Sequence, residues 1–211
     1  RIRRTIQTKR EQQKKETRET LLLAASACFA EKGYSACSVS DIVARAGMSQ
    51  VSLYVHFSGK EDLFKSMIEE EHRQGAEKAR LASCSAPFLN GVISLMTDCI
   101  IDGGFPIYHR LWTEILAVAA RDDSMRTAFI SSDREMRIVF SRLLEKAAES
   151  GEIDGSLDFD AVSIWLYALV DGLIARVAAD GNFDIRKHLD LFELLVRRAL
   201  QPQIQQAKTE K

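Results

Sequence analysis

Apolar and polar residues follow one another along this chain with a helical period. Between Thr17 and Lys32, Leu21, Ala25 and Phe29 fall four positions apart and form an apolar stripe on one helical face. The same spacing predicts further helices at about 38–47, 50–55, 58–80, 88–102, 106–120, 124–150, 159–179 and 185–200. Only three prolines and eleven glycines interrupt the 211 residues. The pattern therefore predicts an all-α protein of about nine helices.

The stretch from Ser38 to Phe57 holds two of these helices, joined by a tight turn. Ser38 is placed to cap the first helix, and Asp41, three residues later, is placed to complete a capping box. Gly47 ends that helix, because glycine enters the left-handed backbone region without a Cβ clash. Ser49 then caps a second helix that buries a single leucine, which is too little for independent stability. This arrangement favours a helix-turn-helix, whose second helix reads DNA.

The outward side of the second helix is the candidate DNA-binding surface. Gln50 lies outside the apolar stripe, and glutamine can read adenine bidentately or contact phosphate. Tyr54 either packs its ring against the preceding helices or contacts phosphate through its hydroxyl, and it can do both. Ser58 and Glu61 are expected to form a capping box for the next helix. Lys60 lies within that box, where a cation opposes the helix dipole, so a phosphate contact is expected. The candidate DNA-binding residues are Thr17, Arg18, Ser38, Ser40, Ser49, Gln50, Val51, Ser52, Tyr54, His56 and Lys60.

Charge divides the chain into a basic front and an acidic body. Residues 1–60 carry eleven Lys and Arg against five Asp and Glu, giving +6. Residues 61–211 carry eighteen against twenty-five, giving −7 and a net charge of −1 for the chain. A polyanion would therefore meet the N-terminal part only. Residues 1–15 form a basic arm, which is either a DNA-contacting segment, disordered at first, or a solubilising tail.

Several residues at fixed spacing resemble a known family. They are Phe29, Gly33, Ala46-Gly47, Leu53-Tyr54, His56-Phe57, Lys60 and Leu63. Over residues 17–68 they resemble the N-terminal domain of tetracycline-repressor (TetR) family regulators. The resemblance implies a DNA-binding domain at 16–66 with its motif at 38–57, and an effector-binding and dimerisation domain at 67–201. Pro202 ends the last predicted helix, so residues 202–211 are expected to form a polar tail. Val51 departs from the family pattern, in which small residues are frequent at this position.

The resemblance also implies a function. It predicts a sequence-specific DNA-binding regulator, in the form of a dimeric repressor that a small apolar or amphipathic effector releases from a palindromic double-stranded operator. One alternative keeps DNA binding but replaces the small ligand by a protein partner or by no effector. The other alternative is a helical protein-interaction module without DNA binding, which duplex binding with a steep salt dependence would exclude.

Aromatic and methionine residues gather in the body of the chain. Such stripes are commonly core, but their number and the family resemblance together favour a pocket between the helices from 88 to 179. The expected effector-binding residues are Phe88, Met96, Phe105, Tyr108, His109, Trp112, Leu116, Phe140 and Trp165.

The helix at 159–179 is apolar nearly all round, so two of its sides must be covered. Its own domain is one cover, and a second copy of the chain is the simplest other. Together with the helix at 185–200, it predicts a four-helix interface of a homodimer. The expected interface residues are Tyr167, Val170, Leu173, Ile174, Val177, Leu189, Phe192, Leu195 and Val196.

Other kinds of chemistry find little support in the sequence. The four histidines are scattered and no cysteine pair has metal-ligand spacing, so no metal site is expected. A glycine-rich phosphate loop is missing, and neither a cofactor nor an enzymatic activity is expected. The four cysteines are expected to be free thiols acting as small buried hydrophobes, with redox sensing as the alternative. Neither a signal peptide nor an apolar run of about 18 residues is visible, which favours a cytoplasmic protein without a membrane span.

Overall fold

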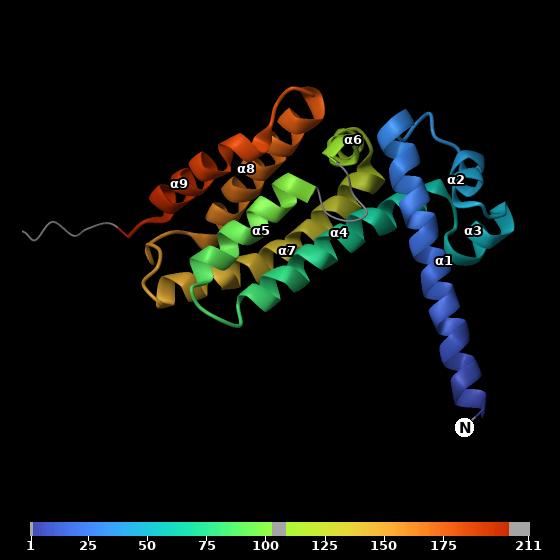
Figure 1. Cartoon of the computed structure of the whole chain (residues 1–211), viewed down its shortest axis with the longest axis horizontal. Helices are drawn as coiled ribbons and strands as arrows, with labels where there is room; N and C mark the ends of the chain where they lie inside the picture. The colour runs from blue at the N-terminus through green and yellow to red at the C-terminus, as the bar shows by residue number, and fades with distance from the viewer. Residues whose placement is uncertain (1, 103–108, 203–211) are drawn as a thin grey trace, which may run out of the picture. The chain divides into compact units, whose positions relative to one another are not determined.

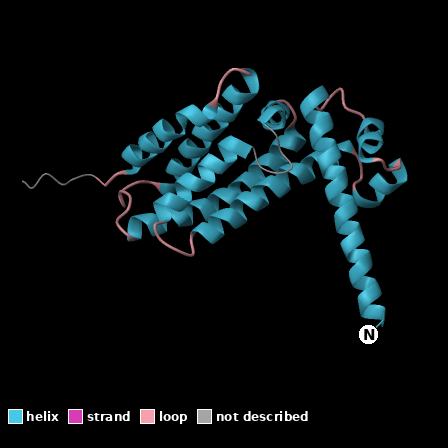
Figure 2. Ribbon diagram, viewed as in Figure 1, coloured by secondary structure: helices cyan, strands magenta, loops and turns pink. Residues whose placement is uncertain are grey.

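The computed structural model describes the backbone of residues 2–102 and 109–202, and it confirms the all-α class. Within these residues the chain forms nine α-helices, one short 3₁₀-helix and no strand (Figure 1 and Figure 2). The helices are α1 (Ile2–Lys32), α2 (Val39–Ala46), α3 (Gln50–His56), α4 (Lys60–Ala82), α5 (Phe88–Asp102), α6 (His109–Ala119), α7 (Asp123–Glu149), α8 (Phe159–Ala179), η1 (Ile185–His188) and α9 (Leu189–Leu200).

The helices form two compact units. The first unit runs from the N-terminus to Glu71 and takes in α6 and the start of α7 as far as Ser132. The second unit holds His72–Asp102 and the chain from Asp133 onwards. The predicted boundary near residue 66 lies close to the first change of unit. The return of α6 to the N-terminal helices was not predicted, because helical periodicity does not say which helices pack together.

The core of the first unit lies where α1, α4 and α6 meet the short helices α2 and α3. Phe29 of α1 and Phe64 of α4 are buried and meet edge to face, with ring centroids 5.2 Å apart. Ile115 brings α6 into the same core. The Glu114 carboxylate of α6 accepts a hydrogen bond from the Tyr34 N–H at 2.7 Å. α6 therefore also holds the turn that follows α1.

α1 is longer than the sequence predicted. A partly disordered arm was expected before a helix start near Thr17, but α1 is helical from Ile2. Glutamate, glutamine, lysine and arginine dominate this segment, and all four favour helix. The Gln12 side chain donates to Glu16, one turn away, at 2.9 Å. Thr17 and Arg18 therefore lie inside a helix, where their N–H groups are unavailable to a phosphate.

In the second unit α4 and α7 pack closely and run in the same direction (Figure 1). A Cβ on Gly75 would lie 2.9 Å from the Met136 sulfur, so this close approach favours glycine. α5 packs against α8 and α9. The Glu152 carboxylate accepts hydrogen bonds from the N–H groups of Phe88 and Leu89, at 3.0 and 2.7 Å, and so caps the start of α5.

α8 is the one helix among the described residues that is long and apolar enough to cross a membrane, by length and composition alone. A core helix of a soluble protein passes the same test. The expectation from uninterrupted apolar runs missed this helix because Asp171 and Arg176 interrupt its sequence. Only 22% of its most apolar window is buried within the chain, so much of its apolar surface faces outward.

Candidate nucleic-acid interface

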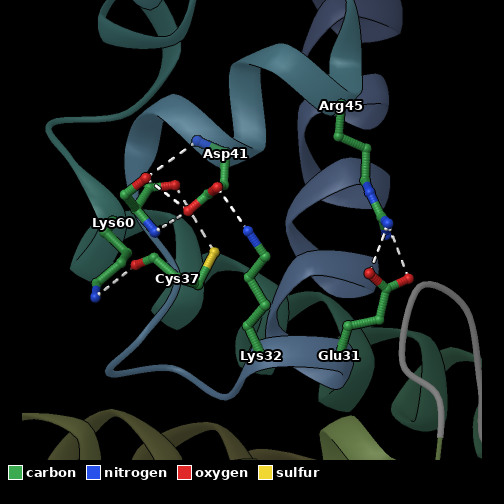
Figure 3. A network of polar contacts seen from close by, with 7 residues as sticks. Glu31, Lys32, Cys37, Asp41, Arg45 and Lys60 are labelled. Atoms are coloured by element: carbon green, nitrogen blue, oxygen red, sulfur yellow. Dashed lines mark hydrogen bonds and ion pairs between the residues drawn. The ribbon is translucent and has the colours of Figure 1, made fainter.

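Two ion pairs fix α2 to the end of α1, and a capping box closes the first turn of α2 (Figure 3). The Ser38 hydroxyl accepts from the Asp41 N–H at 3.1 Å, and Asp41 accepts from the Ser38 N–H at 2.9 Å, which confirms the predicted capping box. The Lys32 Nζ lies 2.6 Å from Asp41, and Arg45 pairs with Glu31 at 2.7 Å. The hydrogen bond from Lys32, followed by those from Ser38, lowers the pKa of the Asp41 carboxyl well below its usual range. These contacts give the next helix a firm support.

α3 begins directly after the turn that the sequence predicted. Gly47 adopts the left-handed conformation with φ of 64°, and its neighbour Met48 donates back to the Val43 carbonyl at 2.9 Å. Ser49 caps α3 by accepting from the Ser52 N–H at 3.2 Å. Leu53 is completely buried and anchors the helix to the core of the first unit. The rest of α3 is thereby free to face a partner.

The outward face of α3 carries one amide, one phenol and two apolar side chains. The Gln50 Nε2 donates to the Ser40 hydroxyl of α2 at 2.9 Å, which orients the exposed amide. Val51, Tyr54 and Val55 are 74%, 54% and 66% exposed. An oriented amide can read adenine, and apolar side chains can contact the thymine methyl group. The face has the chemistry of a major-groove reader.

Val55 was absent from the predicted surface. The available signal was its position four residues after Val51, which places both on one helical stripe. The bond between Gln50 and Ser40 was also unforeseen, because it joins two helices across the turn. Val55 therefore joins the candidate DNA-binding residues.

Other predicted DNA contacts have structural partners. The Thr17 hydroxyl donates to the Gln13 carbonyl at 2.8 Å inside α1. The Arg18 guanidinium lies over the Phe57 ring, 5.1 Å from its centroid. The hydroxyls of Ser38 and Ser49 act as helix caps, and the side chains of Ser52 and His56 are half-buried. The helix-start argument for Thr17 and Arg18 is wrong, because α1 begins far upstream.

Lys60 does not face outward as the phosphate prediction assumed. Its Nζ donates to the Cys37 carbonyl at 2.9 Å (Figure 3). It also donates to the Tyr34 carbonyl at 2.8 Å and lies 4.5 Å from the Tyr34 ring centroid. Lys60 therefore lies at the start of α4 because its ammonium group binds the turn between α1 and α2. The expected capping partner is also different, since Asp62, not Glu61, accepts from the Ser58 N–H.

The predicted effector residues are divided between the two units. Trp112 packs against Phe129 and the core of the first unit, with ring centroids 6.0 Å apart. Met96 and Phe140 are buried in the second unit. Trp165 is 76% exposed, so its placement in an interior pocket is wrong. His109 and Leu116 are half-buried in the first unit and Phe88 in the second, whereas Phe105 and Tyr108 lie outside the described residues.

The apolar faces of α8 and α9 differ from the predicted ones. Val170, Ile174, Phe192 and Val196 are buried in the chain's own core, so their placement on a dimer surface is wrong. Tyr167, Leu173, Val177 and Leu189 are half-buried, and Leu195 is exposed as expected. The exposed apolar side chains are Ile164, Trp165 and Leu169 on α8 with Leu191, Leu194 and Leu195 on α9. The sequence left open which side of α8 is buried in its own chain, because α8 is apolar on nearly every side.

Cysteines and metal-ligand groups give no second site in the described part of the chain. Cys28 and Cys37 are buried thiols, as expected, and burial raises the pKa of Cys37 to about 12. Cys84 is exposed, which corrects the expectation for that residue. Among the residues described, no three His, Cys, Asp or Glu side chains are grouped so that they could hold a metal ion.

Two family models match this chain. Residues 21–67 match the bacterial regulatory proteins of the tetR family, and residues 107–201 match the C-terminal part of BetI-type transcriptional repressors. The first match covers the helix-turn-helix and its support on α1 and α4. The second covers most of the remaining helices.

Known proteins resemble the chain over most of its length. The HTH-type transcriptional repressor AcnR of Corynebacterium diphtheriae is 29% identical over 181 residues, which covers 85% of this chain and 91% of AcnR. The regulator TtgR of Pseudomonas putida is 25% identical, with coverage of 80% and 82%. The solved structure of FadR from Bacillus subtilis in complex with stearoyl-CoA shares the fold, with a TM-score of 0.72, 20% identity and coverage of 86% and 98%. The outward face of α3 and these matches together place the chain in the TetR family of DNA-binding transcriptional regulators.

Proposed function

We propose that this regulator is a homodimeric repressor, which a small apolar or amphipathic effector releases from a palindromic double-stranded operator. The observation that carries the proposal is the outward face of α3, where Gln50, Val51, Tyr54 and Val55 stand exposed on a rigidly held helix. Repression is supported by the relative AcnR, which is named a repressor. The amphipathic effector is supported by the stearoyl-CoA of the B. subtilis FadR structure.

A second copy of the chain would cover the outward apolar side chains of α8 and α9. The proposed interface is Ile164, Trp165 and Leu169 with Leu191, Leu194 and Leu195. A closed two-fold dimer buries such a surface on both subunits at once. It also presents two copies of α3, which fits a palindromic operator.

Effector release follows from linkage between two binding equilibria. An effector that binds more tightly to the arrangement with the weaker operator affinity shifts the protein towards that arrangement. Operator binding is then weakened by at most the ratio of the effector's affinities for the two arrangements. Helix α4 is shared by both units and is the proposed lever. Within the second unit, Phe88, Met96 and Phe140 remain as proposed effector contacts.

DNA recognition is tested by selecting an operator from random duplexes and comparing variants on it. Gln50→Ala should relax the preference at one operator position and cost about 1–3 kcal/mol if the contact to adenine is bidentate. Ser40→Ala should weaken the same preference less, because it removes only the hydroxyl that orients the Gln50 amide. Asn182→Ala, which removes an exposed amide in the second unit, is the matched control. Unchanged base preference in both test variants would refute the assignment.

Effector release is tested on the same operator with stearoyl-CoA as the first probe. Coupling of about 1–3 kcal/mol corresponds to roughly 5- to 150-fold weaker operator binding. Phe140→Ala should reduce that response more than it changes operator binding without the probe. Operator binding that no apolar or amphipathic probe weakens would favour a regulator with a protein partner or no effector.

A further inference from the structure

A basic groove lies between α4 and α7 in the second unit. It is open to solvent on one side and has a volume of about 400 Å³. The α4 side presents Arg73, Glu77 and Arg80, spaced three and four residues apart on one helical stripe. The α7 side presents Arg142 and Lys146, one turn apart. Four cations and one carboxylate therefore converge on a single concave surface.

Two of the four cations of the groove, Arg142 and Lys146, form no ion pair with the residues that the structure describes. Arg80 uses two nitrogens on the Glu77 carboxylate, at 2.9 and 2.6 Å, and this pairing lowers the pKa of Glu77. The Lys146 Nζ donates to the Ser83 carbonyl at 2.7 Å, which satisfies a donor without neutralising its charge. Arg142 is exposed and has no ion pair with the described residues. The formal charges of the side chains that line the groove sum to +3.

That charge stands out against its surroundings. Residues 72–102 and 133–202 hold twelve Lys and Arg against sixteen Asp and Glu, so the second unit is acidic overall. Like charges on facing helices repel one another and do not serve packing. The gathering of cations here is therefore not explained by the stability of α4 and α7.

We propose that this groove binds a small, multiply charged anion through its phosphate or carboxylate groups. Arginine offers a planar pair of donors that matches both groups bidentately. Ala76 and Val139 also line the groove and provide an apolar surface for the uncharged part of the ligand. The volume lies within the range of small-molecule sites, about 300–1,000 Å³. The lining of the groove shares no residue with the α3 face or with the proposed effector contacts, although Lys146 lies over the Phe88 ring, 5.9 Å from its centroid, so the site goes beyond the proposed repressor function.

The test is isothermal titration calorimetry of the full chain with two probes, sodium pyrophosphate and sodium succinate, at matched ionic strength. We expect saturable binding of one or both probes with one site per chain, and the tighter probe identifies the head group. Arg142→Ala should weaken binding about 10-fold or more, as the loss of a charge-assisted hydrogen bond does. Arg142→Glu should abolish binding. Since Arg142 is exposed, the thermal melting of both variants should match the wild type.

Arg134→Ala is the control, because Arg134 is an exposed arginine of α7 that does not line the groove. Equal weakening in this control and in Arg142→Ala would show diffuse charge attraction and overturn the proposal. Failure of both probes to bind saturably would overturn it as well. If neither anion binds while Arg142→Ala weakens binding to duplex DNA, the groove is a DNA surface and the proposal fails. Operator binding is measured separately, so these outcomes leave the repressor function independently testable.

Discussion

Replacing Lys60 by methionine separates its structural role from the phosphate role that its sequence position suggested. The variant keeps the aliphatic stem and removes the ammonium group. That group donates to the carbonyls of Tyr34 and Cys37 at 2.8 and 2.9 Å and lies 4.5 Å from the Tyr34 ring centroid. The structure therefore predicts a loss of stability and only a secondary effect on DNA.

The expected loss can be worked out from these contacts. A hydrogen bond to a charged group contributes about 1.5–3 kcal/mol, and a cation over an aromatic face adds about 0.5–1 kcal/mol at an exposed site. Lys60 is half-buried, so water partly replaces its bonds to the two carbonyls. We therefore expect Lys60→Met to lower the free energy of unfolding by about 2–4 kcal/mol.

Two measurements check this reasoning. Urea unfolding, followed by circular dichroism, gives the loss of stability, and operator affinity against salt concentration gives the number of phosphate contacts. The logarithmic salt slope of the folded variant should match the wild type, because a lost phosphate contact would change it by about 0.9. Lys78→Met, an exposed lysine of α4, is the control. Stability within about 0.5 kcal/mol of wild type together with a reduced salt slope would refute the structural role.

Two further predictions concern the second unit. Leu191→Glu should yield monomers and weaken operator binding, whereas Leu81→Glu, at a similar exposure of 57% against 54%, should leave the dimer intact in analytical ultracentrifugation. A wild-type chain that sediments as a monomer at micromolar concentration would contradict the dimer. Burial lowers the pKa of His72 from 6.5 to about 4, so the unfolded chain takes up a proton at a higher pH than the folded chain does. Stability should therefore fall by about 2 kcal/mol between pH 7.5 and 5, and His72→Gln should flatten that dependence in urea unfolding.

Local signals in the sequence were enough to locate the motif and the helices, apart from the start of α1. The cap of α2 needs only Ser38 and Asp41, and the turn needs only Gly47, so these features depend on neighbours within a few residues. The buried anchor Leu53 and the exposed Gln50 follow from the helical period of a short segment. DNA binding could be predicted for the same reason, since it depends on this compact motif.

Packing decided what the period of the sequence could not. From the sequence alone, a cation at a helix start suggests a phosphate contact. The carbonyls that accept hydrogen bonds from Lys60 belong to Tyr34 and Cys37, which lie more than twenty residues earlier in the chain, so the sequence does not reveal them. α8 has apolar residues on nearly every side, so only its neighbours reveal that Val170 faces inward and Trp165 outward. The basic groove joins residues of α4 and α7 that are far apart in the chain. Sequence determined the helices and the motif through contacts within single turns, and tertiary structure decided the outward faces through contacts between helices.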